Sequence, residues 1–153
     1  MKKELFRLKK VKVEKNLVTI NYKSNSSDKE YTEKSKIQPH PDFINALKKF
    51  GPLVAEVFDM PEENKDKLTI NGIVISEKND SEQVMVLSTF ETMSGAKVAI
   101  NTPNISMETD HWAGQGTLGE DSDGVVDECY QYLFKNKAAQ LVIPMEEDNG
   151  EQL

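Results

Sequence analysis

Residues 68–75 read LTINGIVI, and the predicted fold depends on how this run is interpreted. Apolar and polar residues alternate on both sides of Gly72, but the phase of the alternation changes at that glycine. Such a change is typical of a β-bulge inside one strand, although Asn-Gly is also the strongest two-residue hairpin signal. A hairpin at this position would have two arms of only four residues, and each arm would be marginally stable as a strand. We therefore expect one bulged strand.

Period-two alternation predicts strands on both sides of this run. Residues 5–24 alternate around Glu14-Lys15-Asn16, which indicates a hairpin whose asparagine tolerates the left-handed conformation. Residues 84–90 and 96–100 predict a second hairpin, with its turn at residues 92–95. The polar residues between the first hairpin and the first helix, 24–30, are expected to form a mobile loop.

Two segments show the spacing of amphipathic helices. Apolar residues repeat at intervals of three and four over 41–58, beginning at Pro41, which suits a first helical turn. Because Gly51-Pro52 interrupts this stretch, we expect a kinked helix or two short helices in line. A second helix is predicted over 124–138, with Asp123 capping its N-terminus.

The predicted order of elements is β-β-α-β-β-β-α. Consecutive antiparallel strands with helices on one face indicate an α+β two-layer sandwich, with a sheet of about five strands and two helices. Residues 1–144 are expected to form one domain, closed by a short strand at 140–144, and the acidic residues 145–153 a disordered tail.

The charge of the chain is unevenly distributed. Residues 1–36 hold eleven Lys and Arg against five Asp and Glu, whereas the remainder holds eight against twenty-one. A basic face can meet phosphate and an acidic face can meet basic proteins, but both can also be ordinary solvated surface. With no apolar run of about 18 residues, no secretory signal and a single cysteine, the sequence predicts a cytoplasmic protein away from membranes.

Catalytic, metal and cofactor signatures are not recognised in the sequence. His40 and His111 are the only histidines, and residues 121–124 fail to match a calcium loop in register. Cys129 falls on the apolar stripe of the predicted C-terminal helix, which indicates a core residue. We therefore predict a binding protein with no catalytic residues, no metal and no cofactor.

Residues 101–124 are predicted to form a long loop that provides the main contact surface. They contain half of the eight glycines and the only tryptophan, and long loops are uncommon unless functional or disordered. Alternatively, Trp112 folds back against the open edge of the sheet. The candidate contact residues are His111, Trp112 and Gln115.

The N-terminal hairpin is an alternative binding site, for single-stranded nucleic acid. Lysines can hold phosphates while an aromatic ring stacks on a base, although lysines on edge strands also prevent aggregation. The candidate residues are Lys9, Lys10, Lys12, Lys15, Lys23 and Tyr22.

Four segments resemble small uncharacterised proteins encoded by tailed bacteriophages: residues 38–48, 68–75, 101–103 and 132–140. The resemblance implies a phage origin and a non-catalytic role in DNA metabolism or in countering host defence, and it transfers no functional residues. We expect a binding or adaptor protein that acts on a host or phage protein, and homo-oligomers are among the expected assemblies. The alternatives are a single-stranded nucleic-acid-binding protein and a sponge for a nucleotide signal.

Overall fold

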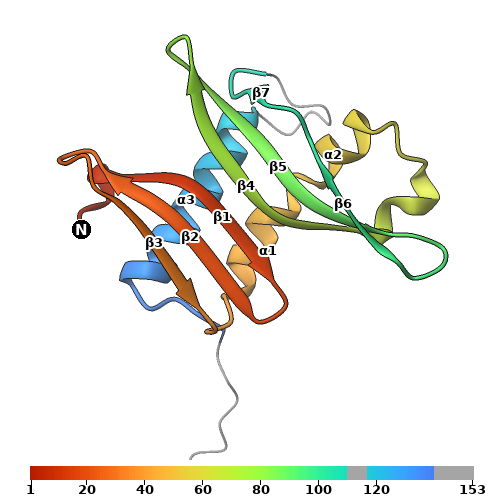
Figure 1. The fold of residues 1–153 in the computed structure, drawn as a ribbon, viewed down its shortest axis with the longest axis horizontal. Coiled ribbons are helices and arrows are strands. Elements are labelled where there is room, and N and C mark those ends of the chain that lie inside the picture. The colour runs from red at the N-terminus through yellow and green to blue at the C-terminus, as the bar shows by residue number, and fades with distance from the viewer. Residues whose placement is uncertain (110–116, 140–153) are drawn as a thin grey trace, which may run out of the picture.

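The computed structural model describes residues 1–109 and 117–139. An antiparallel sheet dominates the fold, with its strands in the order β3-β2-β1-β4-β5-β6 and a short β7 paired to β5 (Figure 1). The strands are β1 Phe6–Glu14, β2 Leu17–Ser24, β3 Glu30–Ser35, β4 Leu68–Lys78, β5 Ser81–Glu91, β6 Lys97–Asn101 and β7 Ile105–Ser106. The helices are α1 Pro41–Lys48, α2 Gly51–Val57 and α3 Leu118–Phe134, with 3-10 turns at Lys3–Leu5 and Glu62–Lys67.

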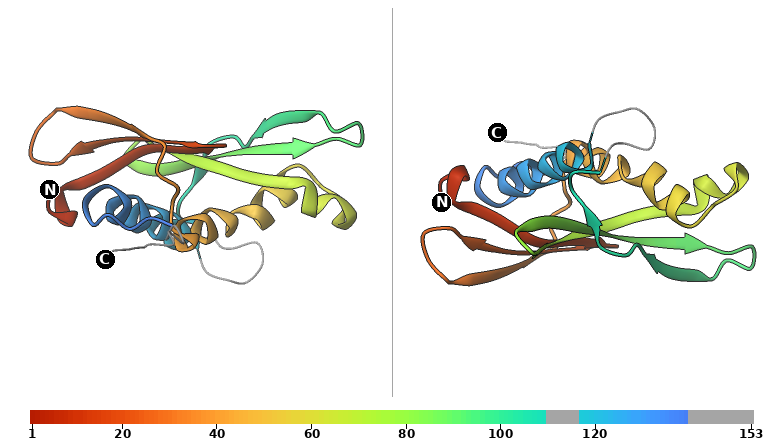
Figure 2. Two further views of the ribbon diagram at one scale, coloured as in Figure 1. Left: turned by 90° about the horizontal axis from the view of Figure 1, so that it is seen from below. Right: turned by 90° about the horizontal axis from the view of Figure 1, so that it is seen from above.

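All three α-helices lie on one side of the sheet, and the other side, called the open face below, carries no helix of the described chain (Figure 2). Val11 and Ile73 of the sheet and Phe43 and Leu118 of the helices are buried between the two layers. This arrangement confirms the predicted α+β two-layer sandwich, with more strands than expected.

The proline-containing segment forms two short helices in line, one of the two expected outcomes. Gly51-Pro52 begins α2, so the proline lies where its missing N–H is tolerated. The N-cap of α1 is His40, whose Nδ1 accepts a hydrogen bond from the Asp42 backbone N–H (3.0 Å). This contact explains the role of one of the two histidines.

Residues 68–75 lie within a single bulged strand, as predicted. The register of β4 against β5 shifts between Ile70 and Gly72. Gly72 is required at the bulge because a Cβ there would lie 1.8 Å from the carbonyl oxygen of Val11. The glycine therefore allows β4 to approach β1 closely.

The expected loop over residues 24–30 ends in an additional strand. Strand β3 begins at Glu30 and pairs with β2 in a register that places Tyr31 opposite Tyr22. Its sequence, EYTEKS, carries almost no apolar residues, because an edge strand needs little burial. Hydrophobic alternation therefore gave no signal for it. The turn of the first hairpin also differs in detail, since Lys15 rather than Asn16 has positive φ (41°).

The C-terminal helix begins at Leu118, so the predicted start at residue 124 and the predicted cap at Asp123 are wrong. Thr117 Oγ1 accepts from the Glu120 N–H (3.1 Å), and Glu120 Oε1 accepts from the Thr117 N–H (2.8 Å). This capping box supplies the N-terminal hydrogen bonds. Gly119 and Gly124 lie in the first two turns of α3, and because glycine is typical of loops, the sequence pattern does not indicate the start of the helix. Because α3 begins at Leu118, the loop predicted over residues 101–124 extends too far toward the C-terminus.

Candidate ligand pocket

Strands β1 and β4 lie side by side at the centre of the sheet, yet they pair over only three residues. The pairs are Lys10–Val74, Val11–Ile73 and Lys12–Gly72. Because a bulge bends its strand, β4 turns away from β1 immediately before Gly72. We call the resulting gap the seam: residues 13–15 border it on the β1 side and residues 68–71 on the β4 side. No strand of the described residues pairs with either border across this gap.

Asn71, the bulged residue, closes the narrow end of the seam. Its Nδ2 donates to the carbonyl oxygen of Val13 (3.4 Å), and its Oδ1 accepts from Thr89 Oγ1 (2.6 Å). A side chain thus takes the place of a backbone partner for Val13. The hydrogen bond also shows that the Val13 carbonyl points into the seam.

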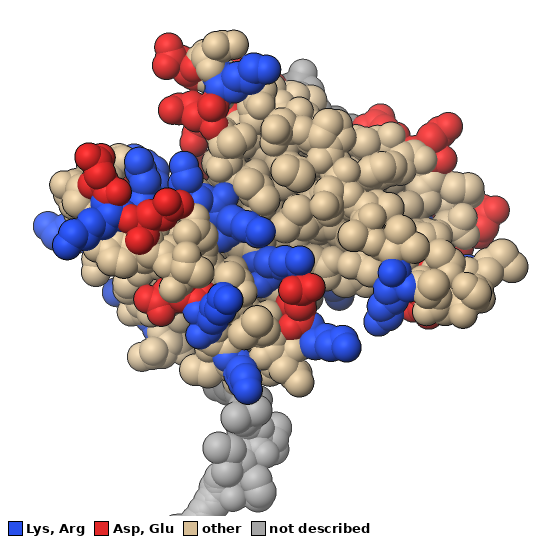
Figure 3. Space-filling view, in the orientation of Figure 1, with Lys and Arg blue, Asp and Glu red and all other residues tan. Residues whose placement is uncertain are grey.

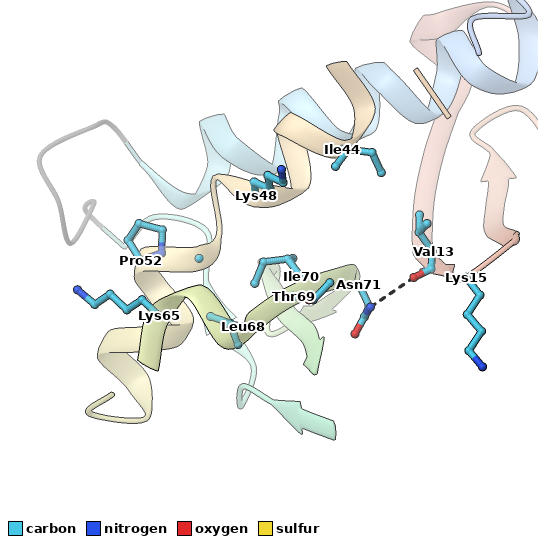
Figure 4. Close-up of a pocket in the computed structure, with 11 residues that line it drawn as sticks. Val13, Lys15, Ile44, Lys48, Pro52, Lys65, Leu68, Thr69, Ile70 and Asn71 are labelled. Atoms are coloured by element: carbon cyan, nitrogen blue, oxygen red, sulfur yellow. Dashed lines mark hydrogen bonds between the residues drawn. The ribbon is translucent and has the colours of Figure 1, made fainter. Parts of the chain in front are cut away.

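A pocket of about 480 Å³ opens beneath the seam, between the sheet and the helices (Figure 4). Ile44 and Lys48 reach it from α1, four residues apart and so on one face of that helix. Its walls are mainly apolar, and cavities of this size are typical of binding sites. The apolar lining consists of Val13, Ile44, Gly51, Pro52, Leu68 and Ile70.

Three lysines from three different segments surround the pocket: Lys15 from the β1–β2 turn, Lys48 from α1 and Lys65 from the 3-10 turn before β4. Figure 4 shows Lys15 and Lys65 extending on opposite sides of the apolar residues. Lys65 pairs with the exposed Glu62 (3.2 Å). Within the described part of the chain, no carboxylate lies at ion-pair distance from Lys15 or Lys48, and the pocket lining contains none. The site therefore combines an apolar interior with a cationic rim.

The seam is also bordered by a hollow on the open face. This second hollow shares Lys15, Thr69 and Asn71 with the pocket, but Glu14 and Glu91 also line it. Its charge is therefore mixed and its lining is more polar. The helix-side pocket is the better candidate for binding an apolar group next to an anion.

The lysines predicted to bind nucleic acid do not form one cluster. Lys10, Lys12 and Lys23 lie on the open face of β1 and β2, where Lys12 pairs with Glu14 (3.4 Å). Lys9 occupies a β-bulge, and Lys15 lies at the pocket. Figure 3 shows charged side chains over β1–β3, while much of the surface over β4 and β5 carries none.

Tyr22 does not face these lysines, contrary to the expectation of a stacking platform. It is 5% exposed on the helix side of the sheet and stacks on Tyr31, with ring centroids 5.2 Å apart. All four aromatic residues of the described strands share this side: Phe6, Tyr22, Tyr31 and Phe90. Strand alternation with the buried Ile20 already contained this information.

The remaining predictions concern the loop contact residues, the C-terminal segments and Cys129. His111, Trp112 and Gln115 lie outside the described residues, as do the predicted strand at 140–144 and the predicted tail at 145–153. Cys129 is completely buried, and this burial raises the pKa of its thiol well above the usual value. It is a core residue, as predicted from its helical spacing.

Of the residues that line the pocket, the sequence analysis predicted only Lys15 as a binding residue, and it assigned Lys15 to nucleic acid. No known protein family, curated protein or solved structure matches the chain. None of the described helices is long and apolar enough to cross a membrane. In residues 1–109 and 117–139, no group of three or more His, Cys, Asp or Glu side chains is arranged to hold a metal ion.

Proposed function

We propose that this chain is a non-catalytic binding protein that holds an extended, acidic and apolar segment of a host or phage protein in the pocket beneath the seam. The observation that carries the proposal is the apolar pocket with three lysines around it, set below two strand borders that do not pair with each other. Phage origin and a role in DNA metabolism or anti-defence remain part of the proposal.

Each part of the site has a counterpart in an extended peptide. Backbone groups along the seam can form hydrogen bonds with a peptide as in β-strand addition. The Val13 carbonyl already accepts from Asn71 and has a second lone pair with which it can accept from the peptide. Alternate side chains of such a peptide point to the same side, where they can pack against the apolar walls of the pocket. Carboxylates beside them can pair with Lys15 and Lys48, whose charge also selects against basic partners.

The geometry favours a protein segment over the two alternatives. Sequence-tolerant binding of single strands relies on aromatic rings that stack on bases, and the aromatic residues of the described strands face the helices. A nucleotide could place phosphates near the lysines, but none of the described residues that line the pocket offers an aromatic ring on which its base could stack. An aliphatic side chain with a neighbouring carboxylate matches both features.

Selection from a displayed library of random twelve-residue peptides tests the proposal. Selected sequences should combine a run of aliphatic residues with Asp or Glu. A pocket variant, Lys15→Glu, Lys48→Glu and Lys65→Glu, should bind the selected peptides at least about tenfold more weakly, because three charge pairs of up to about 1 kcal/mol each are reversed.

The matched control reverses three lysines of the open face: Lys10→Glu, Lys12→Glu and Lys23→Glu. This variant has the same change in net charge, so long-range electrostatics alone would affect both variants equally. We expect it to retain peptide binding. Loss of binding in the control with retention in the pocket variant would reject the pocket as the site, and salt-sensitive binding of oligothymidine lost in the control would instead support the nucleic-acid alternative.

A further inference from the structure

The described chain ends beside the N-terminal end of α1, the helix that contributes Ile44 and Lys48 to the candidate pocket. The N–H of Ala139 donates to the carbonyl oxygen of Gln38 (2.9 Å), and Ala138 forms a bridge with Pro39. These contacts place the chain next to the start of α1, the helix that carries Ile44 and Lys48 into the pocket. The last described residue, Ala139, therefore lies at the start of the helix that lines the site.

This end of the chain is held in place by charge. Lys137 Nζ pairs with Asp42 Oδ2 at the start of α1 (2.9 Å) and with Glu128 Oε1 of α3 (3.2 Å). The hydrogen bond to Asp42 is the main reason that the pKa of Lys137 is raised. Lys137, three positions before residue 140, is therefore fixed to both α1 and α3.

In an extended conformation, residues 140–145 are long enough to reach from the end of the described chain to the pocket. From Pro41 to Lys48 the axis of α1 rises about 10 Å, at about 1.5 Å per residue. Six extended residues, 140–145, span roughly 20 Å at about 3.3 Å per residue. The two residues of α1 that line the pocket, Ile44 and Lys48, lie about 4.5 Å and about 10 Å along this axis from Pro41, which is less than that span.

The composition of the segment matches the pocket. Residues 140–153 read QLVIPMEEDNGEQL: after the initial glutamine come five apolar residues, 141–145, and Glu146, Glu147 and Asp148 follow. Aliphatic walls and a rim of three lysines are the complement of this order. A tethered segment also has an effective concentration that a separate ligand reaches only at about the millimolar level.

We infer that residues 140–153 of the chain itself occupy the pocket in the absence of a partner, with the run at 141–145 against the apolar walls and the following carboxylates at the lysines. The inference rests on the proposed function, because it assigns an intramolecular competitor to the same site. A partner segment must then displace the chain's own C-terminal residues, which lowers its apparent affinity.

A paramagnetic label on the full-length chain tests this placement. A nitroxide is attached to Gln152→Cys, since the native Cys129 is buried and unreactive in the folded state. The amide signals of Gly51, Thr69 and Asn71 should lose intensity, whereas those of Met85 on the open face should not. The loss should disappear in Lys48→Glu/Lys65→Glu and return when Glu146→Lys/Glu147→Lys is added to that variant.

Three results overturn the inference. The first is full intensity at Gly51, Thr69 and Asn71 in the labelled chain. The second is a loss that the lysine reversals leave unchanged. The third is a loss of the same size when nitroxide-labelled chains without ¹⁵N are mixed with ¹⁵N chains that carry no nitroxide, because the occupant would then come from a second copy. If a library-selected peptide still shifts these three signals, the proposed function stands and only the tail assignment fails.

Discussion

Gly72 in β4 touches the backbone of Val11 in β1 so closely that a Cβ on the glycine would lie 1.8 Å from the Val11 carbonyl oxygen. This contact is at the last paired position before the two strands separate. The same glycine therefore holds the centre of the sheet together and marks where the candidate pocket begins.

Replacing Gly72 with alanine should push β1 and β4 apart. We expect Gly72→Ala to lower the free energy of unfolding by on the order of 1–3 kcal/mol, as overpacking of a tight contact does. Urea unfolding measures the effect. Gly51→Ala is the matched control, because a Cβ at Gly51 meets nothing within 4 Å and alanine is favoured over glycine in a helix. Equal stability of both variants would contradict this assignment.

The capping box of α3 predicts a second stability effect. Thr117→Ala removes the acceptor for the Glu120 N–H and should lower the free energy of unfolding by about 1 kcal/mol. Asp123→Ala, at the position that the sequence suggested as the cap, should change stability much less, since Asp123 lies inside the helix. The reverse ranking in thermal or urea unfolding would contradict a helix start at Leu118.

The stability of the fold should fall in acid partly through Asp127. Its hydrogen bond from Lys3 is the main reason that the pKa of this carboxyl lies below its ordinary value. A lowered pKa stabilises the folded state above the unfolded-state pKa of about 3.9, and the contribution is lost as the pH falls through the folded-state pKa. In urea unfolding between pH 6 and about pH 2, Asp127→Asn should lose less stability than the wild type. An identical pH dependence would show that the Lys3 contact contributes nothing.

The thiol of Cys129 should not react with thiol reagents until the protein unfolds. Burial raises the pKa of its thiol, so both access and thiolate formation are suppressed in the folded state. A thiol reagent at neutral pH should react at the rate of global unfolding, and rapidly in denaturant. Fast modification of the folded chain would mean that α3 opens locally at this position.

Local patterns predicted much of the fold but little of the pocket. Alternation correctly identified the hairpins and the bulge at Asn71-Gly72, because half-buried strands impose a period of two. Strand β3 was missed since its polar residues lie at the edge of the sheet. The pocket was missed because it depends on the divergence of β1 and β4, whose paired residues are about sixty positions apart in sequence.

The most direct test of the binding site is a titration of the ¹⁵N-labelled chain with one library-selected peptide. The pocket assignment predicts that the amide signals of Ile44, Thr69 and Asn71 shift, with a weaker response in the Lys15→Glu, Lys48→Glu and Lys65→Glu variant, while Val74 and Met85 on the open face remain unchanged. Shifts centred on Val74 and Met85, with Ile44 and Thr69 unaffected, would contradict the account and place binding on the open face of the sheet.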